Sequence, residues 1–264
     1  MRFAALILLP LTAICLASCG GITATTKPED SPSPAQVYTP YASSVQRETA
    51  KVSDGQITQL VQGNNRFAFN LFHKLLAENP DTSVFSPFSV SSALAMAYAG
   101  AGGETKAQMA AALEFTLGDE VLHSGFNKLS TELAKRNLPR TVRANAQELL
   151  INNAIWPYVA KPPAASFLDT LARHYGSGVN GLDYLRAPDQ SRLTINEKVN
   201  EWTRGYITDL LPNGSVTRDT RLVLTSAIYL HAPWDYTFGE VFTKPTPFNN
   251  LNGTVVDVPT MSNV

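Results

Sequence analysis

The side chains able to do chemistry are few in this chain, and most of them are scattered. No metal-ligand spacing connects the four histidines, which are His73, His123, His174 and His231. No two carboxylates can be read as a general acid and base, so we interpret Asp183, Asp189 and Asp209 as surface or capping residues. The G-x-S-x-G elbow, the P-loop and the H-E-x-x-H motif do not occur. The sequence therefore predicts no enzyme, no cofactor and no metal site.

Both cysteines lie in the first 19 residues. Arg2 and the apolar run over residues 3–16 are typical of an export signal that is too short to span a bilayer comfortably. The sequence LASC at positions 16–19 resembles a bacterial lipobox, in which cleavage before the cysteine leaves that residue lipidated. We therefore expect lipidation at Cys19, which would attach an extracytoplasmic protein to a membrane of the bacterial cell envelope. The alternative is an ordinary secretory signal and a secreted protein.

Length and composition fit one or two folded domains behind this signal. The chain has 264 residues, of which 44% are hydrophobic and 16% charged, with a formal net charge of -1. Because phosphate binding needs a basic surface, this charge argues against nucleic acid as a partner. Residues 20–55 are rich in Thr, Ser, Pro and Ala, which predicts a flexible tether between the signal peptide (1–19) and a domain over 56–264.

The stretch from Ser83 to Met109 is expected to hold the central helix of that domain. Ser86 is a favoured N-cap, and the proline after it fits the first helical position. From Ser89 to Tyr98 the residues are small or apolar on all sides, which indicates a buried helix. Thr105, with Gln108 three residues later, predicts a capping box that opens the next helix.

Periodicity predicts five more helices. They are a helix after a cap at Asn64 or Asn65, two pieces over 113–137 broken at Gly118 and Gly125, a helix over 166–175, and one over 194–204 with a capping box at Thr194 and Glu197. The last of these carries an apolar stripe, so it should lie on a sheet.

Several segments read as β-strands. The segments 147–158 and 179–185 have β-branched and aromatic content, and the almost wholly apolar run over 220–231 predicts a strand covered on both faces in the middle of a sheet. Asn252-Gly253 predicts a hairpin turn between two further strands.

Three of these segments resemble the serpin family. F-S-P-x-S-V-x-x-A-L with G-x-x-G-E-T-x-x-Q-M resembles its helix B to helix C region, and I-N-x-x-V-N-x-x-T-x-G-x-I-x-D-L-L resembles helix F and its exit loop. L-V-L-x-S-A-I-Y-L-x-x-x-W is similar to the third strand of its large sheet. The matching segments run in the family's order from Asn64 to Met261. Two departures are Lys198, where the family usually has tryptophan, and Ser226, where most members have asparagine.

The resemblance implies an α+β fold, with helices packed on a large central β-sheet and part of a second sheet. Serpins inhibit serine- or cysteine-type endopeptidases: the protease cleaves a reactive loop, which then inserts into the sheet as a new strand. The family places Ser86, Ser89 and Ser226 where that sheet opens, and Trp234 near the point where the loop enters. Plain helix capping, first-turn packing and an ordinary core aromatic remain the alternatives for Ser86, Ser89 and Trp234.

The resemblance covers roughly the first two-thirds of a serpin domain, so a C-terminally truncated fold is expected. The reactive loop has no counterpart before Val264, and no reactive-centre residue can be named. We expect that this chain alone does not inhibit a protease, and that a target protease becomes its partner when the missing part is supplied. The alternative is a non-inhibitory, membrane-tethered binding lipoprotein.

Overall fold

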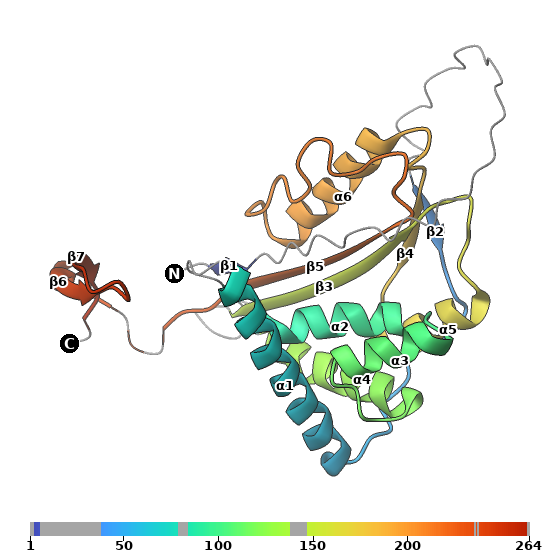
Figure 1. The fold of residues 1–264 in the computed structure, drawn as a ribbon, viewed down its shortest axis with the longest axis horizontal. Helices are drawn as coiled ribbons and strands as arrows, with labels where there is room; N and C mark the ends of the chain where they lie inside the picture. The colour runs from blue at the N-terminus through green and yellow to red at the C-terminus, as the bar shows by residue number, and fades with distance from the viewer. Residues whose placement is uncertain are drawn as a thin grey trace.

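A computed structural model describes residues 3–5, 38–78, 84–137, 147–234, 236 and 238–262. A five-stranded sheet, with helices on both of its faces, forms the body of the molecule (Figure 1). Its strands lie in the order β1-β5-β3-β4-β2. Their bounds are β1 (Phe3–Ala5), β2 (Tyr38–Tyr41), β3 (Glu148–Pro157), β4 (Val179–Leu182) and β5 (Leu222–His231).

The two long central strands, β3 and β5, confirm the prediction from their apolar and β-branched sequences. They pair antiparallel along their whole length, from Glu148 opposite His231 to Pro157 opposite Leu222. On its other side β5 pairs with β1, at Ile228 to Leu230. Among the described residues, no strand lies along that second edge of β5 from 222 to 227. The expectation of a strand in the middle of a sheet therefore holds at one end of β5, and the rest is an edge.

Six α-helices accompany the sheet in the described part of the chain. In Figure 1, α6 lies on one face of β3 and β5, and α2 lies on the opposite face, as the sequence predicted. The bounds are α1 (Asp54–Glu78), α2 (Pro87–Tyr98), α3 (Gly103–Ala112), α4 (Asp119–Ala134), α5 (Ala165–Tyr175) and α6 (Pro188–Trp202).

Helix α2 is the buried helix that its composition predicted. The Ser86 side chain accepts a hydrogen bond from the backbone N–H of Ser89, which confirms the predicted N-cap. Ala95 and Met96 are fully buried, and Met96 packs with Ile155 of β3. An apolar helix of this kind is stable because both the sheet and the outer helices cover it.

Helix α1 begins ten residues before the predicted cap at Asn64 or Asn65, so that prediction was wrong. Ser53 and Gln56 form a reciprocal capping box: Ser53 N–H donates to Gln56 Oε1 at 2.9 Å, and Gln56 N–H donates to Ser53 Oγ at 3.3 Å. Gly63 lies inside α1 and allows the helix to pass close to the backbone at Glu114. A Cβ built there would lie 2.5 Å from the carbonyl oxygen of Glu114.

Helix α4 is continuous, although two pieces broken at Gly118 and Gly125 were predicted. Gly118 is the N-cap, and Gly125 lies inside the helix. A Cβ built at Gly125 would lie 2.6 Å from Leu60 Cδ2, so this glycine lets α4 approach α1 closely. The predicted break at Gly125 was wrong: the glycine is there because the two helices pack closely, and it does not end a helix.

Two predicted capping boxes are also wrong. Helix α3 begins at Gly103 after an N-cap at Gly102, so Thr105 and Gln108 lie inside the helix. Helix α6 begins with a proline at 188, and Thr194 lies inside it, where its hydroxyl donates to the carbonyl of Gln190 at 3.0 Å. In both cases the helix starts earlier than the capping pattern suggested.

The C-terminal strands form the predicted hairpin. Strands β6 (Lys244–Asn249) and β7 (Val255–Thr260) pair antiparallel, and Gly253 takes the left-handed conformation with φ 82° in the turn. A short 3-10 helix, η2 (Glu240–Phe242), precedes the hairpin. Figure 1 shows the hairpin standing away from the body, at the end of the connection after β5.

Part of the predicted tether over residues 20–55 is a strand in the structure. Residues 38–41 form β2, which pairs with β4 at the sheet edge. Residues 20–37 and Cys19 lie outside the described residues. In the described part of the chain, none of the helices has both the length and the apolar content to cross a membrane.

Candidate functional site at the open edge of the sheet

Buried polar side chains gather where α2 passes beneath β3 and β5. Ser89, Ser91 and Ser92 of α2 are all buried in an otherwise apolar helix. The side-chain amide of Asn153, in the middle of β3, donates to Ser92 Oγ at 3.1 Å. Asn153 lies directly opposite Ser226 of β5 in the strand register. The helix and both central strands therefore each contribute a polar group to this junction.

Two oxygens at this junction have no hydrogen-bond partner within the described part of the chain. They are Asn153 Oδ1 and Ser226 Oγ. Leaving a buried polar group unpaired costs on the order of 1–3 kcal/mol, and folded proteins contain few such groups. Ser226 lies in the stretch of β5 whose second edge carries no described strand. The unpaired oxygens and the open strand edge thus coincide.

Ser86 and Ser89 open the helix that supplies this junction. Ser89 donates to Ser86 Oγ twice, through its backbone N–H at 3.4 Å and its hydroxyl at 3.2 Å. Both hydroxyls are therefore engaged in starting α2, which is the structural alternative considered for them. Their place is one helical turn before Ser92, so they fix where the helix begins relative to the strands.

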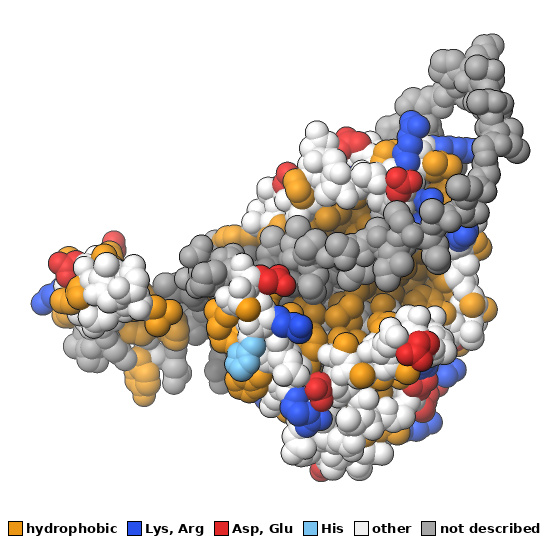
Figure 2. Space-filling view, viewed as in Figure 1, with side chains coloured by type: hydrophobic (Ala, Val, Ile, Leu, Met, Phe, Trp, Pro, Cys, Tyr) orange, Lys and Arg blue, Asp and Glu red, His pale blue; other side chains and the backbone are white. Residues whose placement is uncertain are grey.

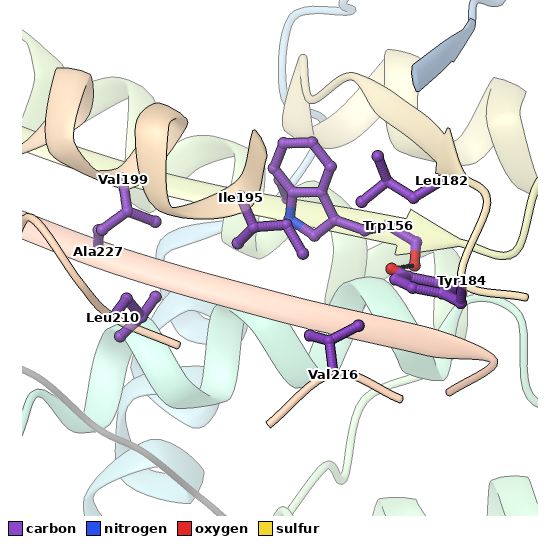
Figure 3. Close-up of a cluster of buried hydrophobic side chains, with 9 residues drawn as sticks. Trp156, Leu182, Tyr184, Ile195, Val199, Leu210, Val216 and Ala227 are labelled. Carbon is purple, nitrogen blue, oxygen red and sulfur yellow. Dashed lines mark hydrogen bonds between the residues drawn. The ribbon is translucent and has the colours of Figure 1, made fainter. Parts of the chain in front are cut away.

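Trp234 lies in the connection that follows β5, and it is 51% exposed. Its ring meets Phe238 edge to face, with centroids 5.3 Å apart. The alternative of an ordinary core aromatic does not apply to this side chain. Trp156 and Tyr184 are two of the aromatic side chains that do fill the core, and they lie on the α6 face of the sheet (Figure 3).

The face of the sheet under α6 is covered by a buried cluster of aromatic and aliphatic side chains. Trp156 Nε1 donates to Thr225 Oγ1 at 2.9 Å, and the Tyr184 hydroxyl donates to the carbonyl of Trp156 at 2.7 Å (Figure 3). Burial raises the pKa of Tyr184, so this hydroxyl keeps its proton. Ile195 and Val199 of α6 are fully buried against this cluster.

A polar network holds the chain that leaves α6. Asn196 donates to Asp209 at 2.7 Å and accepts from the backbone N–H of Leu211 at 2.8 Å. Arg192 pairs with Asp189 at 2.7 Å and with Asp209 at 3.2 Å. Both carboxylates, Asp189 and Asp209, are thus engaged in ion pairs with Arg192. Lys198 of α6 is half-buried and pairs with Glu201 at 2.8 Å.

The arrangement is suited to adding a strand and not to a reaction. An extended segment placed along residues 222–227 would pair with the free backbone groups of β5. Its side chains on the α2 side would lie next to Ser226, whose hydroxyl oxygen has no partner in the described residues. Figure 2 shows hydrophobic side chains gathered between α6 and the helices on the other side of the sheet. In the described ranges, no group of three His, Cys, Asp or Glu side chains could hold a metal ion.

Sequence reasoning did not find Ser91, Ser92 or Asn153 as members of the site. A signal for them exists in retrospect. Asn152-Asn153 interrupts an apolar strand, and Ser91-Ser92 interrupts an apolar helix. Both segments are predicted to be buried, so their polar side chains must form hydrogen bonds with each other or with another part of the chain.

Comparison with known proteins agrees with this architecture. The family described as "Serpin (serine protease inhibitor)" matches residues 62–264. The chain is 40% identical over 191 residues to leukocyte elastase inhibitor of Bos taurus, which covers 72% of this chain and 48% of that protein. It is 32% identical over 205 residues to an uncharacterized serpin-like protein of Methanosarcina mazei, covering 76% and 46% of the two.

The fold is also similar to solved structures. Ovalbumin from emu (Dromaius novaehollandiae) superposes with a TM-score of 0.68 and 25% sequence identity, covering 76% of this chain and 54% of that one. The chain therefore spans about half the length of the relatives that it matches. Relatives such as the bovine protein are named as inhibitors and not as enzymes.

Proposed function

The chain belongs to the serpin family, and we propose that it supplies the sheet-bearing part of a protease inhibitor of the serine or cysteine type. The observation that supports this proposal is the edge of β5 over 222–227, which no described strand covers, together with the buried oxygens of Asn153 and Ser226, which have no partner in the described residues. An edge of this kind is a receptor for a strand, and strand addition is the physical basis of inhibition in this family. Ser86, Ser89 and Ser226 belong to the sheet-opening region in this proposal, and Trp234 to the entry point of the strand.

The chain by itself is proposed not to inhibit. It matches about half the length of its relatives, and inhibition requires both a reactive loop and a sheet that receives it. The test is to incubate the purified 264-residue chain with elastase, trypsin, chymotrypsin and papain. We expect digestion without any complex that survives SDS. An SDS-stable complex with any of the four proteases would contradict this part of the proposal.

The complementary test supplies the rest of the domain. A chimera continues this chain with the second half of bovine leukocyte elastase inhibitor, the half that the 191-residue match does not cover. We expect an SDS-stable complex with elastase, because the added strands complete the sheet and carry a reactive loop. The control is the same chimera with Ser226→Arg, which places a charge at the junction that the inserted strand must cross. If the first chimera folds cooperatively and elastase only digests it, the sheet of this chain does not support inhibition.

We also propose that Cys19 is lipidated and that the protein is held at the bacterial cell envelope. The support is the sequence LASC at positions 16–19 behind an apolar run. Cleavage before Cys19 would remove β1 (Phe3–Ala5), so the sheet of the processed protein would keep β5, β3, β4 and β2. Radiolabelled palmitate should enter the wild-type protein and not a Cys19→Ala variant. Equal labelling of both would exclude this anchor, and release of both into the medium would favour the secreted alternative. If the protein is labelled and the chimera described above does not inhibit elastase, the two results together would favour a non-inhibitory binding lipoprotein.

A further inference from the structure

Residues 38–53, here called the N-terminal strap, cross from the sheet edge to the start of α1. The strap precedes the part of the chain that matches the serpin family, which begins at residue 62. Its first four residues are β2, paired antiparallel with β4 from Tyr38 opposite Leu182 to Tyr41 opposite Val179. The strap thus occupies the edge position of the sheet next to β4.

Tyr41 holds the strap against the sheet. Its hydroxyl donates to the carbonyl of Val159 at 2.8 Å, and its ring packs beside the buried cluster that contains Leu171. The ring covers Gly181 of β4 so closely that a Cβ built there would lie 2.7 Å from Tyr41 Cε2. The β4 strand is therefore shaped to accept this aromatic side chain.

The middle of the strap is bonded to α5. The Ser43 hydroxyl donates to Asp169 at 2.6 Å, and the backbone N–H of Glu48 donates to the carbonyl of Arg173 at 3.0 Å. The Glu48 carboxylate also forms an ion pair with Arg173 at 2.9 Å. These contacts involve the exposed side of α5, and both the backbone and the side chains of the strap contribute to them.

Two buried polar side chains of α4 bond to the strap. Asn127, which is 2% exposed, accepts from Arg47 Nε at 2.9 Å and donates to the carbonyl of Glu48 at 2.8 Å. Ser124, which is 3% exposed, accepts from the backbone N–H of Lys51 at 2.8 Å. Without the strap, these groups would lose those partners inside the folded body. The body is therefore adapted to the strap and is not merely in contact with it.

We propose that the N-terminal strap is an intramolecular edge cover, which keeps the β4 edge from pairing with a second copy of this chain. An uncovered strand edge is a template for another chain, and β5 is already open from 222 to 227 in the described structure. With both edges free, β5 of one copy can meet β4 of the next. Such a contact is head to tail, so it leads to open-ended assemblies and not to a closed dimer.

The test displaces the strap without changing its sequence. Gly181→Ala places a methyl group where the Tyr41 ring lies, and the matched control is Gly178→Ala, where the nearest atom is 3.8 Å away. We expect Gly181→Ala to speed trypsin cleavage after Arg47 and Lys51 by about tenfold or more, because the strap must detach before it can be cut. Light scattering should show a rising average mass for this variant and no change for the control.

A double variant separates strap release from general damage. Tyr41→Ala removes the side chain that the new methyl group would displace, so adding Gly181→Ala to it should cause no further change in cleavage or mass. Additive effects would mean that the alanine disturbs β4 itself, and would overturn the proposal. The proposal also fails if trypsin cleavage accelerates in Gly181→Ala while the average mass stays at that of wild type.

Discussion

Two buried histidines lie face to face between α4 and α5. His123 Nδ1 is 2.7 Å from the hydroxyl of Tyr175, and the rings of His123 and His174 are stacked with centroids 6.0 Å apart. Burial lowers the pKa of His123 to about 4, and the nearby His174 adds to the effect. Burial also lowers the pKa of His174, although Glu120 at 3.6 Å opposes that shift. Both side chains are therefore neutral in the folded protein at pH 7.

This pair predicts a loss of stability in mild acid. A histidine with a pKa of 6.5 when unfolded and about 4 when folded stabilises the fold fully above pH 6.5, and the stabilisation disappears as the pH falls towards 4. Between pH 7 and pH 5, His123 alone should reduce the free energy of unfolding by about 2 kcal/mol. Urea unfolding at the two pH values measures the difference.

The matched variants for this prediction are His123→Gln and His73→Gln. Glutamine can keep a hydrogen bond to Tyr175 but does not titrate, so His123→Gln should weaken the dependence of stability on pH. His73 is exposed on α1, and its replacement should leave that dependence unchanged. If the two variants behave alike, the buried pair does not control the acid response.

At the scale of elements, two glycines in helices have opposite roles. Gly125 of α4 faces Leu60 of α1, where a Cβ would lie 2.6 Å from Leu60 Cδ2. Gly55 lies in the first turn of α1. A Cβ built at Gly55 would have no neighbouring atom nearer than 3.9 Å. The intrinsic helix preference for alanine over glycine is the same at both sites, so the difference between them isolates packing.

Alanine should therefore have opposite effects at these two positions. Gly55→Ala should raise the free energy of unfolding by up to about 1 kcal/mol. Gly125→Ala should lower it by about 1–3 kcal/mol, because α1 and α4 must move apart. Thermal and urea denaturation, followed by circular dichroism, measure both. Stabilisation by Gly125→Ala would show that Leu60 can move aside at no cost.

These glycines also explain which elements were predictable from the sequence. Strands β3 and β5, helix α2 and the hairpin have a uniform pattern along their length, and their types and approximate bounds were predicted. Gly125 was read as a break, because a glycine that permits close packing has the same local sequence signature as one that ends a helix. The contact that distinguishes the two involves residues about fifty positions away or more.

The site was predictable to a smaller extent. Ser86 was found as a cap from local chemistry, and Ser226 and Trp234 only through the resemblance to a family. Asn153 and Ser91 became visible when the structure placed α2 beneath two strands. These residues matter because their side-chain oxygens lack hydrogen-bond partners in the described residues. That lack can be seen only once the helix and the strands are packed together. The strap was read as tether because its stabilising contacts are all with distant elements.

At the scale of the whole molecule, the two edges of the sheet differ. The strap covers β4 with contacts from the backbone, an aromatic ring and buried polar groups, whereas no described strand covers β5 over 222–227. A protein that protects one edge with a dedicated segment has avoided self-association there. The open edge is therefore the place where an incoming strand would meet least competition.

The β6–β7 hairpin should contribute little to the stability of this body. Nearly all of its residues are exposed, and Phe248 lies opposite Val256 on one of its faces, with 54% and 43% of their surfaces exposed. Replacing both (Phe248→Ser with Val256→Thr) should change the free energy of unfolding by less than about 0.5 kcal/mol. Binding of the dye ANS should fall, because an exposed apolar patch is lost. Urea unfolding followed by tryptophan fluorescence reports on the body through Trp156 and Trp202. A clear loss of stability in the double variant would mean that the hairpin packs on the body in solution, and that its apolar face is not free for a partner.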